Sequence, residues 1–498
     1  MHSTKVASKS RMSHLNKFSV GDAYNWSFMR SLARLFFSLI VPIILARILS
    51  PNEFGLMAMS AVFIGIGSLI SDLGTGDALI QRQSRSQALE STIFWLNLTI
   101  ATIFAAILFA TASVISGVYN NTIVGDIIQF MSIMFLFQSL SIVQVSLMKK
   151  KKDFKSIAIA EVFSQVISSI FAITLALNDF GVWSLVAFAL TKSLLYVLAI
   201  WFFSDWMPSW VFKYNELKNV INFSINLTYV KFLNYIERNA DKFIVGFYQG
   251  ANVLGVYSRS YSTFSSSMKF INGFYNPVFY SVIVEAQNDR DKLKKALLES
   301  YQLLLFIFIP ISLIFIFLSN ELVLTIFGEQ WIEMAPMLPI FGYILLFKPL
   351  NKLNVEMFKA VSKVNIMSNI WSFFTPLFVI GFLIGNEFYG SLGVVYAYLF
   401  VSLLLFFTTS RSIFKLLKIT KKNVINKFTN HIARGFLVAA CMILYKYSFT
   451  YHIDNVYVGF VFMGSVIIIL LFYYLLQIFL PIATQNWAYC ELKQRLQK

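Results

Sequence analysis

The feature that most constrains this chain is a succession of long apolar stretches, separated by short polar segments, along most of its 498 residues. A helix needs roughly 20 apolar residues to cross the hydrocarbon core of a bilayer. Only 13% of the residues are charged, against about 25% in soluble domains. The short alternating segments of a membrane β-barrel are absent. We therefore predict an all-α polytopic membrane protein.

The apolar stretches predict about fourteen membrane spans. They are approximately 25–48, 53–74, 91–115, 122–147, 157–177, 181–203, 219–246, 252–283, 297–318, 333–358, 364–385, 389–414, 427–448 and 456–480. The seventh span is the least apolar because it contains "KFLNYIERNADKFIVGF" (231–247). If this stretch were a loop, the basic segments "NDRDKLKK" and "KLLKITKK" would face outward, against the positive-inside rule. We therefore interpret it as a membrane helix and expect both termini to be cytosolic.

A faint internal repeat predicts the domain organisation. "SPNEFGLMAMSAVF" (50–63) aligns with "GANVLGVYSRSYSTF" (250–264), and "FGVWSLVAF" (180–188) resembles "YGSLGVVYA" (389–397). Such repeats are common in transporters, and here they indicate two six-helix halves followed by two extra helices. The expected parts are a tail at 1–24, an N-lobe at 25–203, an interfacial linker at 204–218, a C-lobe at 219–414, extra helices at 427–480 and a tail at 481–498.

Several function classes find no support in the sequence. The net charge of +17 comes from short Lys and Arg clusters between apolar stretches, which are typical of topology signals and not of a nucleic-acid surface. The nucleotide motif GxxxxGK[ST] and the zinc motif HExxH are absent, and Cys441 and Cys490 imply no disulfide framework. We therefore predict no enzyme activity, no catalytic residue, no metal site, no cofactor and no nucleic-acid partner, with H⁺ or Na⁺ as the candidate coupling ion.

Charges inside the predicted spans are the candidate functional groups, since such residues are rare and usually line a wet cavity. Cations outnumber acids on spans one, seven and eight, which suits an anionic ligand, and the fork of Arg binds two phosphate oxygens. The predicted substrate-binding residues are Arg30, Arg34, Lys231, Arg238, Arg259 and Lys269. Asp72, Asp241 and Lys242 are predicted as structural or coupling charges.

Each assignment has a structural alternative. Arg30 could reach the cytosolic interface along its apolar stem. Arg238 and Lys242 could form ion pairs with Glu237 and Asp241. Asp72 could lie at a water-exposed helix end. These alternatives stay open on the sequence alone.

The sequence resembles a known family in several segments. "ARILSPNEFGLMAM" (46–59), "SDLGTGDALIQ" (71–81), "STIFWLN" (91–97) and "RNADKFIVGFYQGANVLGVYSRSY" (238–261) are similar to the Wzx-type oligosaccharide flippases. These belong to the polysaccharide transport branch, with colanic-acid-exporter-like members, of the multidrug/oligosaccharidyl-lipid/polysaccharide exporter superfamily. The resemblance covers residues 20–420 and implies two six-helix lobes in a V-shaped arrangement that work by alternating access.

The resemblance also implies a function. The expected substrate is an oligosaccharide on undecaprenyl diphosphate, moved across the bacterial cytoplasmic (inner) membrane for O-antigen, capsule or exopolysaccharide synthesis. Membrane lipids and a polysaccharide polymerase are the other expected partners. The family's use of cations along the cavity carries over by position to Arg30, Arg34, Arg238 and Arg259. Two alternatives compete: an ion-coupled drug or metabolite exporter of the same superfamily, and a membrane glycosyltransferase, which the short predicted outside loops disfavour.

Overall fold

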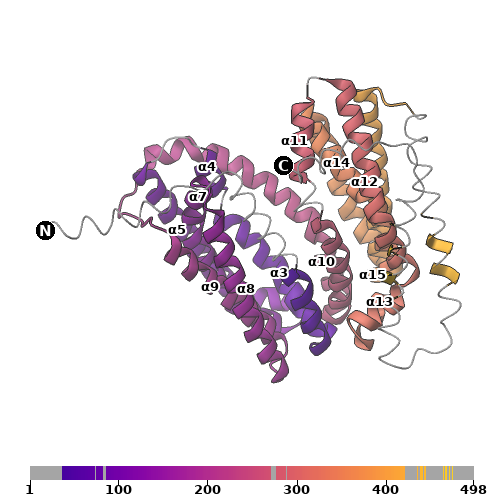
Figure 1. Cartoon of the computed structure of the whole chain (residues 1–498). Helices are drawn as coiled ribbons and strands as arrows, with labels where there is room; N and C mark the ends of the chain where they lie inside the picture. The colour runs from indigo at the N-terminus through magenta and orange to yellow at the C-terminus, as the bar shows by residue number, and fades with distance from the viewer. Residues whose placement is uncertain are drawn as a thin grey trace. The chain divides into compact units, whose positions relative to one another are not determined.

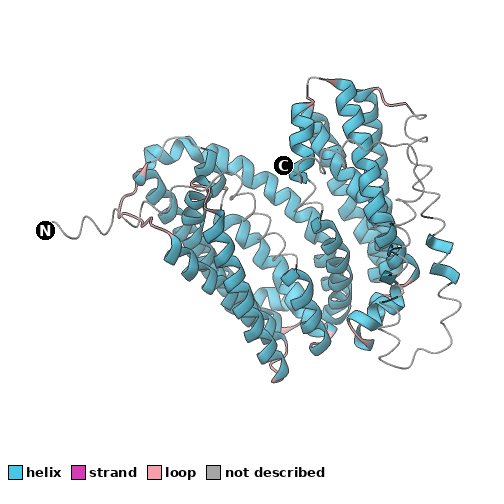
Figure 2. Cartoon of the chain, in the orientation of Figure 1, coloured by secondary structure: helices cyan, strands magenta, loops and turns pink. Residues whose placement is uncertain are grey.

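The computed structural model describes residues 36–72, 74–81, 86–270, 276–287 and 289–420, with scattered positions between 435 and 474. Every regular element within these residues is a helix (Figures 1 and 2), so the predicted all-α class is confirmed. Seven of the described helices are long and apolar enough to cross a membrane. The number of fourteen spans stays a prediction.

The chain divides into two compact units. Unit 1 holds the residues up to Asn239 except Ser50–Gly55, and unit 2 holds that short segment together with the residues from Ala240 onward. The division falls within the helix α10, Tyr214–Phe270. The lobe boundaries predicted at residues 204–218 stay a prediction.

Unit 1 is a set of helices, most of them joined by short connections. Its helices are Phe36–Ile48, α3 (Pro51–Asp72), α4 (Thr75–Gln81), α5 (Gln87–Val118), α6 (Thr122–Ser132), α7 (Met134–Lys150), α8 (Phe154–Leu177), α9 (Val182–Phe203) and the first part of α10. Ser86, Asn121 and Asp153 precede α5, α6 and α8, and each side chain accepts a hydrogen bond from a backbone N–H of the first turn. Such caps satisfy otherwise orphaned donors, so they fix where these helices begin.

Two glycines allow close packing on α3. A Cβ atom added to Gly65 would collide with the Tyr235 side chain of α10, and one added to Gly67 would collide with Phe135 and Phe104. Close approach of this kind is the usual role of small residues between membrane helices. The segment "GIG" (65–67) is therefore a packing element within α3 and not part of a nucleotide-binding loop.

The segment 204–213 lies against the start of α5 and is held there by hydrogen bonds. The backbone N–H of Ser209 donates to Ser91 Oγ at 3.0 Å, and the indole N–H of Trp95 donates to the Ser209 carbonyl at 2.9 Å. The connection after α9 is therefore an ordered segment that packs on unit 1.

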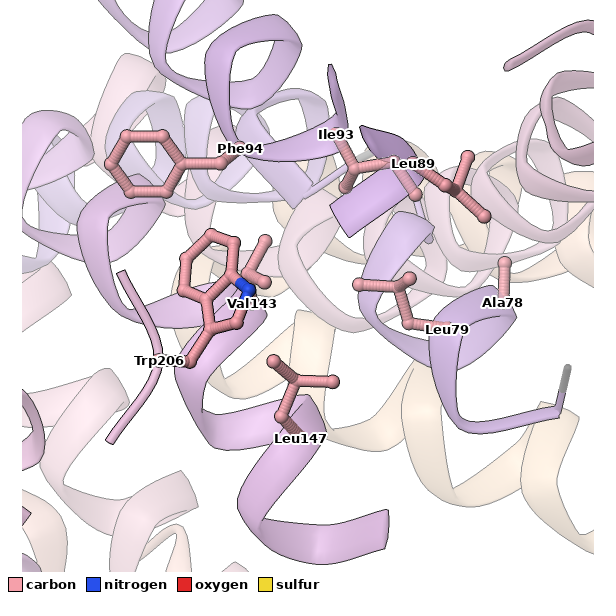
Figure 3. Packing of buried hydrophobic residues seen from close by; sticks show 8 residues of the cluster. All are labelled: Ala78, Leu79, Leu89, Ile93, Phe94, Val143, Leu147 and Trp206. Atoms are coloured by element: carbon pink, nitrogen blue, oxygen red, sulfur yellow. The ribbon is translucent and has the colours of Figure 1, made fainter. Parts of the chain in front are cut away.

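The two Trp residues of this segment differ in burial. Trp206 is 7% exposed and packs into a hydrophobic cluster with Phe94 and Val143 (Figure 3). Trp210 is 88% exposed, and its ring stacks on Trp95 with centroids 4.5 Å apart. One inward and one outward Trp are compatible with the interfacial depth predicted for this linker.

Unit 2 contains two helices that break in the middle. Its elements are the later part of α10, α11 (Asn276–Glu285), α12 (Arg290–Phe317), α13 (Ser319–Ile326), the 3₁₀ helix η2 (Glu329–Met334), α14 (Leu338–Ala360) and α15 (Val364–Leu417). Gly250 interrupts α10 with φ +81°, and Gly390 interrupts α15 with φ +60°. Gln249 joins the two breaks, because its amide donates to Asn386 and accepts from the Ser391 N–H at 3.1 Å.

Both sequence echoes coincide with recurring local structure. Gly181 and Gly390, which align in the second echo, have φ/ψ of 54°/−132° and 60°/−142°, and each precedes a helix. In the first echo, a Cβ added to Gly55 would collide with the Ala251 carbonyl, and one added to Gly255 would collide with the Pro51 carbonyl. These reciprocal contacts lie within unit 2, where the first turn of α3 packs on the turn of α10 that follows Gly250.

The C-terminal extra helices, predicted at 427–480, are described at scattered positions only. Val438, Met442 and Val466 form a buried cluster with Leu318, against partly buried residues such as Phe306. These positions therefore pack on α12 within unit 2. We further predict from the repeat, which accounts for twelve helices only, that this pair does not line a central cavity. Arg434 and Lys446, whose positions would test this prediction, lie outside the described residues.

Candidate functional site

The predicted substrate-binding residues lie in different parts of the chain. Arg30 and Arg34 are outside the described residues, as is the side chain of Asp72. The other predicted site residues are on α10. Lys231 and Arg238 belong to unit 1, and Asp241, Lys242, Arg259 and Lys269 belong to unit 2.

Lys231 forms an ion pair in unit 1. Its Nζ atom lies 3.0 Å from Oδ2 of Asp77 on α4, and the two side chains are 30% and 52% exposed. Asp77 therefore offsets the charge that the sequence assigned to substrate binding. Because the pair is partly exposed, it contributes at most about 1 kcal/mol to stability.

Arg238 is the exposed cation of this part of α10. One helical turn before it, the Tyr235 hydroxyl donates to the Val62 carbonyl of α3 at 2.6 Å, which fixes the rotation of α10 against α3. Arg238 is exposed and forms no hydrogen bond or ion pair with any described residue. Its predicted alternative role, an ion pair with Glu237 or Asp241, is therefore not seen among these residues.

Asp241 is a buried carboxylate in unit 2, with 3% of its surface exposed. Its Oδ2 accepts a hydrogen bond from the Tyr257 hydroxyl at 2.7 Å, and its Oδ1 accepts one from the Lys242 backbone N–H at 2.8 Å. A buried charge is tolerated when it is paired and hydrogen-bonded. Lys242 and Lys348 lie near this carboxylate.

These two lysines lie over aromatic rings. Lys242 Nζ is 5.2 Å from the ring centroid of Tyr261, and Lys348 Nζ is 4.4 Å from that of Tyr398 and 5.5 Å from that of Phe264. The ring quadrupole attracts an ammonium group at such distances. Both lysines are half-buried. The structure thus gathers two cations, one acid and three rings inside unit 2.

Arg259 has an environment that the sequence did not indicate. It is 7% exposed, and its guanidinium carbon lies 5.2 Å from the Phe54 ring centroid and 5.1 Å from that of Phe327. Its Nε atom has no hydrogen-bond partner among the described residues. Phe54 also makes an edge contact with Trp331. Arg259 therefore packs against the first turn of α3 within unit 2. Substrate binding by Arg259 stays a prediction.

The remaining polar groups of the predicted eighth span do not share one environment. Lys269 is exposed at the end of α10, whereas Ser266 is 9% exposed.

On α14, Glu356 forms an ion pair with Lys359 at 3.1 Å. Lys348, a cation inside a predicted span, was not among the predicted site residues. Among the described residues, no group of three or more His, Cys, Asp or Glu side chains could hold a metal ion.

Comparison with known proteins identifies the family. Residues 44–336 match the family described as polysaccharide biosynthesis protein, and this match covers more than half of the chain. The chain belongs to this family. The Wzx-type resemblance of residues 46–59 and 238–261 is thereby confirmed, and the protein is an integral membrane protein of the transporter class.

Two relatives are similar over most of the chain. The lipopolysaccharide biosynthesis protein WzxC of Escherichia coli (strain K12) is 25% identical over 383 residues, which cover 76% of this chain and 77% of that protein. The succinoglycan biosynthesis transport protein ExoT of Rhizobium meliloti (strain 1021) is 25% identical over 334 residues, which cover 67% of each chain.

The fold resembles that of a solved transporter. The lipid II flippase MurJ, in an inward closed conformation, superposes with a TM-score of 0.72 at 14% identity, covering 91% of this chain and 97% of that one. At this identity the likeness concerns the fold alone.

Proposed function

We propose that this protein is a flippase that moves undecaprenyl-diphosphate-linked oligosaccharide repeat units across the bacterial cytoplasmic (inner) membrane. It acts by alternating access, with both termini cytosolic, and supplies O-antigen, capsule or exopolysaccharide synthesis. It is a transporter and not an enzyme. The polymerase that consumes the repeat units is its expected partner.

The observation that carries this proposal is the family match over residues 44–336, which spans helices of both units. The relatives WzxC and ExoT are named for lipopolysaccharide biosynthesis and succinoglycan biosynthesis transport, and both names concern polysaccharides. A transporter of diphosphate-linked sugars must carry an anionic, strongly hydrated head group through hydrocarbon.

The cations of α10 support binding of the diphosphate group of the substrate. Arg238 is exposed and has no partner among the described residues, so its guanidinium is available to an anionic ligand. A charge-assisted hydrogen bond contributes roughly 1.5–3 kcal/mol. A ligand that binds the inward and outward states with different affinity shifts their populations. In the proposed mechanism, cations such as Arg238 contribute to this difference in affinity.

The alternative is an ion-coupled drug or metabolite exporter of the same superfamily, with H⁺ or Na⁺ as coupling ion. It requires a buried acid that binds the ion, and Asp241 is buried. However, the family match over residues 44–336 is to a polysaccharide biosynthesis protein. This match favours the flippase.

Deletion of the gene in its bacterium tests the proposal. We expect prenyl-linked repeat units to accumulate and the surface polysaccharide to be lost, with both effects reversed by a plasmid copy. Mass spectrometry of extracted lipids measures the first effect. Unchanged lipid-linked oligosaccharides together with increased drug sensitivity would instead support the exporter.

A further inference from the structure

Four consecutive lysines form the turn between α7 and α8 in unit 1. Lys149 lies in the last turn of α7, and Lys152 follows the helix with φ +61°. Lys149 is half-buried and Lys152 is exposed. Neither side chain forms a hydrogen bond or an ion pair with any described residue. The lysine turn (149–152) therefore contains two ammonium groups whose charge no described residue offsets.

The segment that connects α9 to α10 lies beside the lysine turn. Lys151 Nζ is 3.5 Å from Oδ2 of Asp205, and the two side chains are 50% and 88% exposed. Trp206, the next residue, belongs to the same buried cluster as Leu147 of α7 (Figure 3). The exposed ion pair contributes little to stability. The buried Trp206 therefore holds the connecting segment (204–213) at the end of α7 that carries the lysines.

Large apolar side chains on both sides of Asp205 are exposed. Phe202 at the end of α9 is 84% exposed, and Met207 is 67% exposed. The backbone beside them is fixed, because the Gln87 amide donates to the Met207 carbonyl at 2.8 Å. Exposed apolar groups that adjoin polar ones mark an interaction surface, and the exposed Trp210 of the same segment favours interfacial depth. This surface therefore suits contact with lipid at the level of the head groups.

We propose that the lysine turn and the connecting segment form a binding site for an anionic phospholipid. The ammonium groups of Lys149 and Lys152 bind the phosphodiester of its head group, and Phe202 and Met207 contact the adjoining part of its acyl chains. In the predicted topology the lysine turn faces the cytosol, so the lipid belongs to the cytosolic leaflet, whose surface potential attracts basic segments. The proposal does not depend on the transported substrate.

Unit 2 supplies a matched comparison for the lysines. Lys415 and Lys418 at the end of α15 are exposed, and neither side chain forms a hydrogen bond or an ion pair with any described residue. The predicted topology places this end of α15 in the cytosol as well. Residues 408–420 include no exposed large hydrophobic side chain. General attraction to an anionic membrane acts on both pairs of lysines, whereas the proposed site exists at the lysine turn.

Crosslinking from one defined position tests the site in the full-length protein. The protein carries p-benzoylphenylalanine at Met207 and is reconstituted in vesicles of phosphatidylglycerol and phosphatidylcholine in equal amounts. Mass spectrometry identifies the head group of each captured lipid. We expect phosphatidylglycerol to be captured about fivefold more than phosphatidylcholine, which corresponds to one basic residue at an anionic surface.

A second probe position controls for the crosslinking chemistry. Ile170 is 61% exposed on α8 and lies roughly 24 Å along this helix from Phe154, which follows the lysine turn. The same probe at Ile170 should capture the two lipids equally. A preference for phosphatidylglycerol at both positions would overturn the site, because it would reflect the probe or the membrane and not the lysine turn.

Two double variants separate the site from general attraction. Lys149→Gln with Lys152→Gln should bring capture at Met207 close to equal amounts. Lys415→Gln with Lys418→Gln removes the same charge from unit 2 and should leave the fivefold preference unchanged. Added salt should reduce the wild-type preference, since exposed charges are screened.

Equal capture of the two lipids at Met207 in the wild-type protein would overturn the site. An equal loss of preference in both double variants would also overturn it, because the lysines would then act by general attraction alone. The Tm of each variant measures its folding. If the double variant of the lysine turn does not fold, Lys152→Gln alone decides by the same capture ratio, since Lys152 is exposed.

Discussion

Helix α10 carries charged residues in both units, and the two sets have opposite environments. In unit 1, Lys231 and Asp77 form a partly exposed ion pair, and Arg238 is exposed. In unit 2, Asp241 and Arg259 are 3% and 7% exposed. Arg238 and the Lys231–Asp77 pair keep much of their hydration, whereas Asp241 and Arg259 depend on a protein hydroxyl, a backbone N–H group and aromatic rings.

This difference predicts which substitutions affect folding and which affect function. Removing one partner of a buried charge leaves the other uncompensated, which costs several kcal/mol. Removing an exposed charge costs little stability. Substitutions of the buried Asp241 and Arg259 should therefore destabilise the protein, whereas substitution of the exposed Arg238 should change ligand binding.

The largest expected effect is at the reciprocal glycine contact of unit 2. Gly255→Val places side-chain atoms where the Pro51 carbonyl lies. Both sides of this contact are helical backbone and cannot yield easily, so we expect a loss of about 3 kcal/mol or more. Chemical denaturation or the yield of monodisperse protein measures it.

Gly117 supplies the control for this substitution. A Cβ added at Gly117 near the end of α5 meets no atom within 4 Å, so Gly117→Val should be nearly neutral. Equal stability of the Gly255→Val and Gly117→Val proteins would mean that the α3–α10 contact is not close.

The next effect compares one hydroxyl in each unit. Tyr257→Phe removes the donor to the buried Asp241 carboxylate and should cost about 1.5–3 kcal/mol, because the acceptor is charged. Tyr235→Phe removes a donor to the neutral Val62 carbonyl and should cost about 0.5–1.5 kcal/mol. Thermal unfolding of the purified variants measures both. A Tyr235→Phe protein less stable than Tyr257→Phe would contradict the contrast between the units.

Much of the fold was predictable from local sequence signals. The long apolar stretches predicted helices, and the structure confirms the all-α class. The aligned Gly181 and Gly390 share one backbone conformation. These features depend on residues that are close together in the chain or on a repeated pattern. Both can be recognised in a single sequence.

The environment of each charge was not predictable, because the partners are distant in sequence. Lys231 and Asp77 are 154 positions apart. The rings that enclose Arg259 come from α3 and from the end of α13. A helical stripe places residues on one face, but it does not reveal what that face meets. The exposed Arg238 and the buried Arg259 therefore had the same predicted role.

Arg238 should affect ligand affinity without affecting stability. Arg238→Ala removes an exposed cation with no described partner, so we expect an unchanged Tm and about tenfold or more weaker binding of the diphosphate. Arg238→Lys should be intermediate, because the charge remains but the two-pronged geometry is lost. Repeat-unit export in the complemented deletion strain provides the measurement. Arg411 of α15 is also exposed, and Arg411→Ala is the control that should keep full export.

The opposite pattern would reverse the interpretation of Arg238. A lower Tm with normal export in the Arg238→Ala protein would indicate a structural role. Arg259→Ala cannot make this distinction by itself, because Arg259 is buried between two rings and its loss affects packing as well as charge.

The smallest expected effect concerns the ion pair of unit 1. A double-mutant cycle with Lys231→Met, Asp77→Asn and both together isolates the coupling between the two side chains. Their side chains are 30% and 52% exposed, so solvent screens the attraction and the coupling should stay below about 1 kcal/mol. It should also decrease between low and high salt, since exposed pairs are screened within about a Debye length. If α10 is held against unit 1 mainly by this pair, the coupling will instead exceed about 2 kcal/mol and resist salt, as for a buried pair. A small, salt-sensitive coupling would mean that Asp77 restrains Lys231 only weakly. A phosphate could then displace Asp77, and Lys231 could take the substrate-binding role predicted for it.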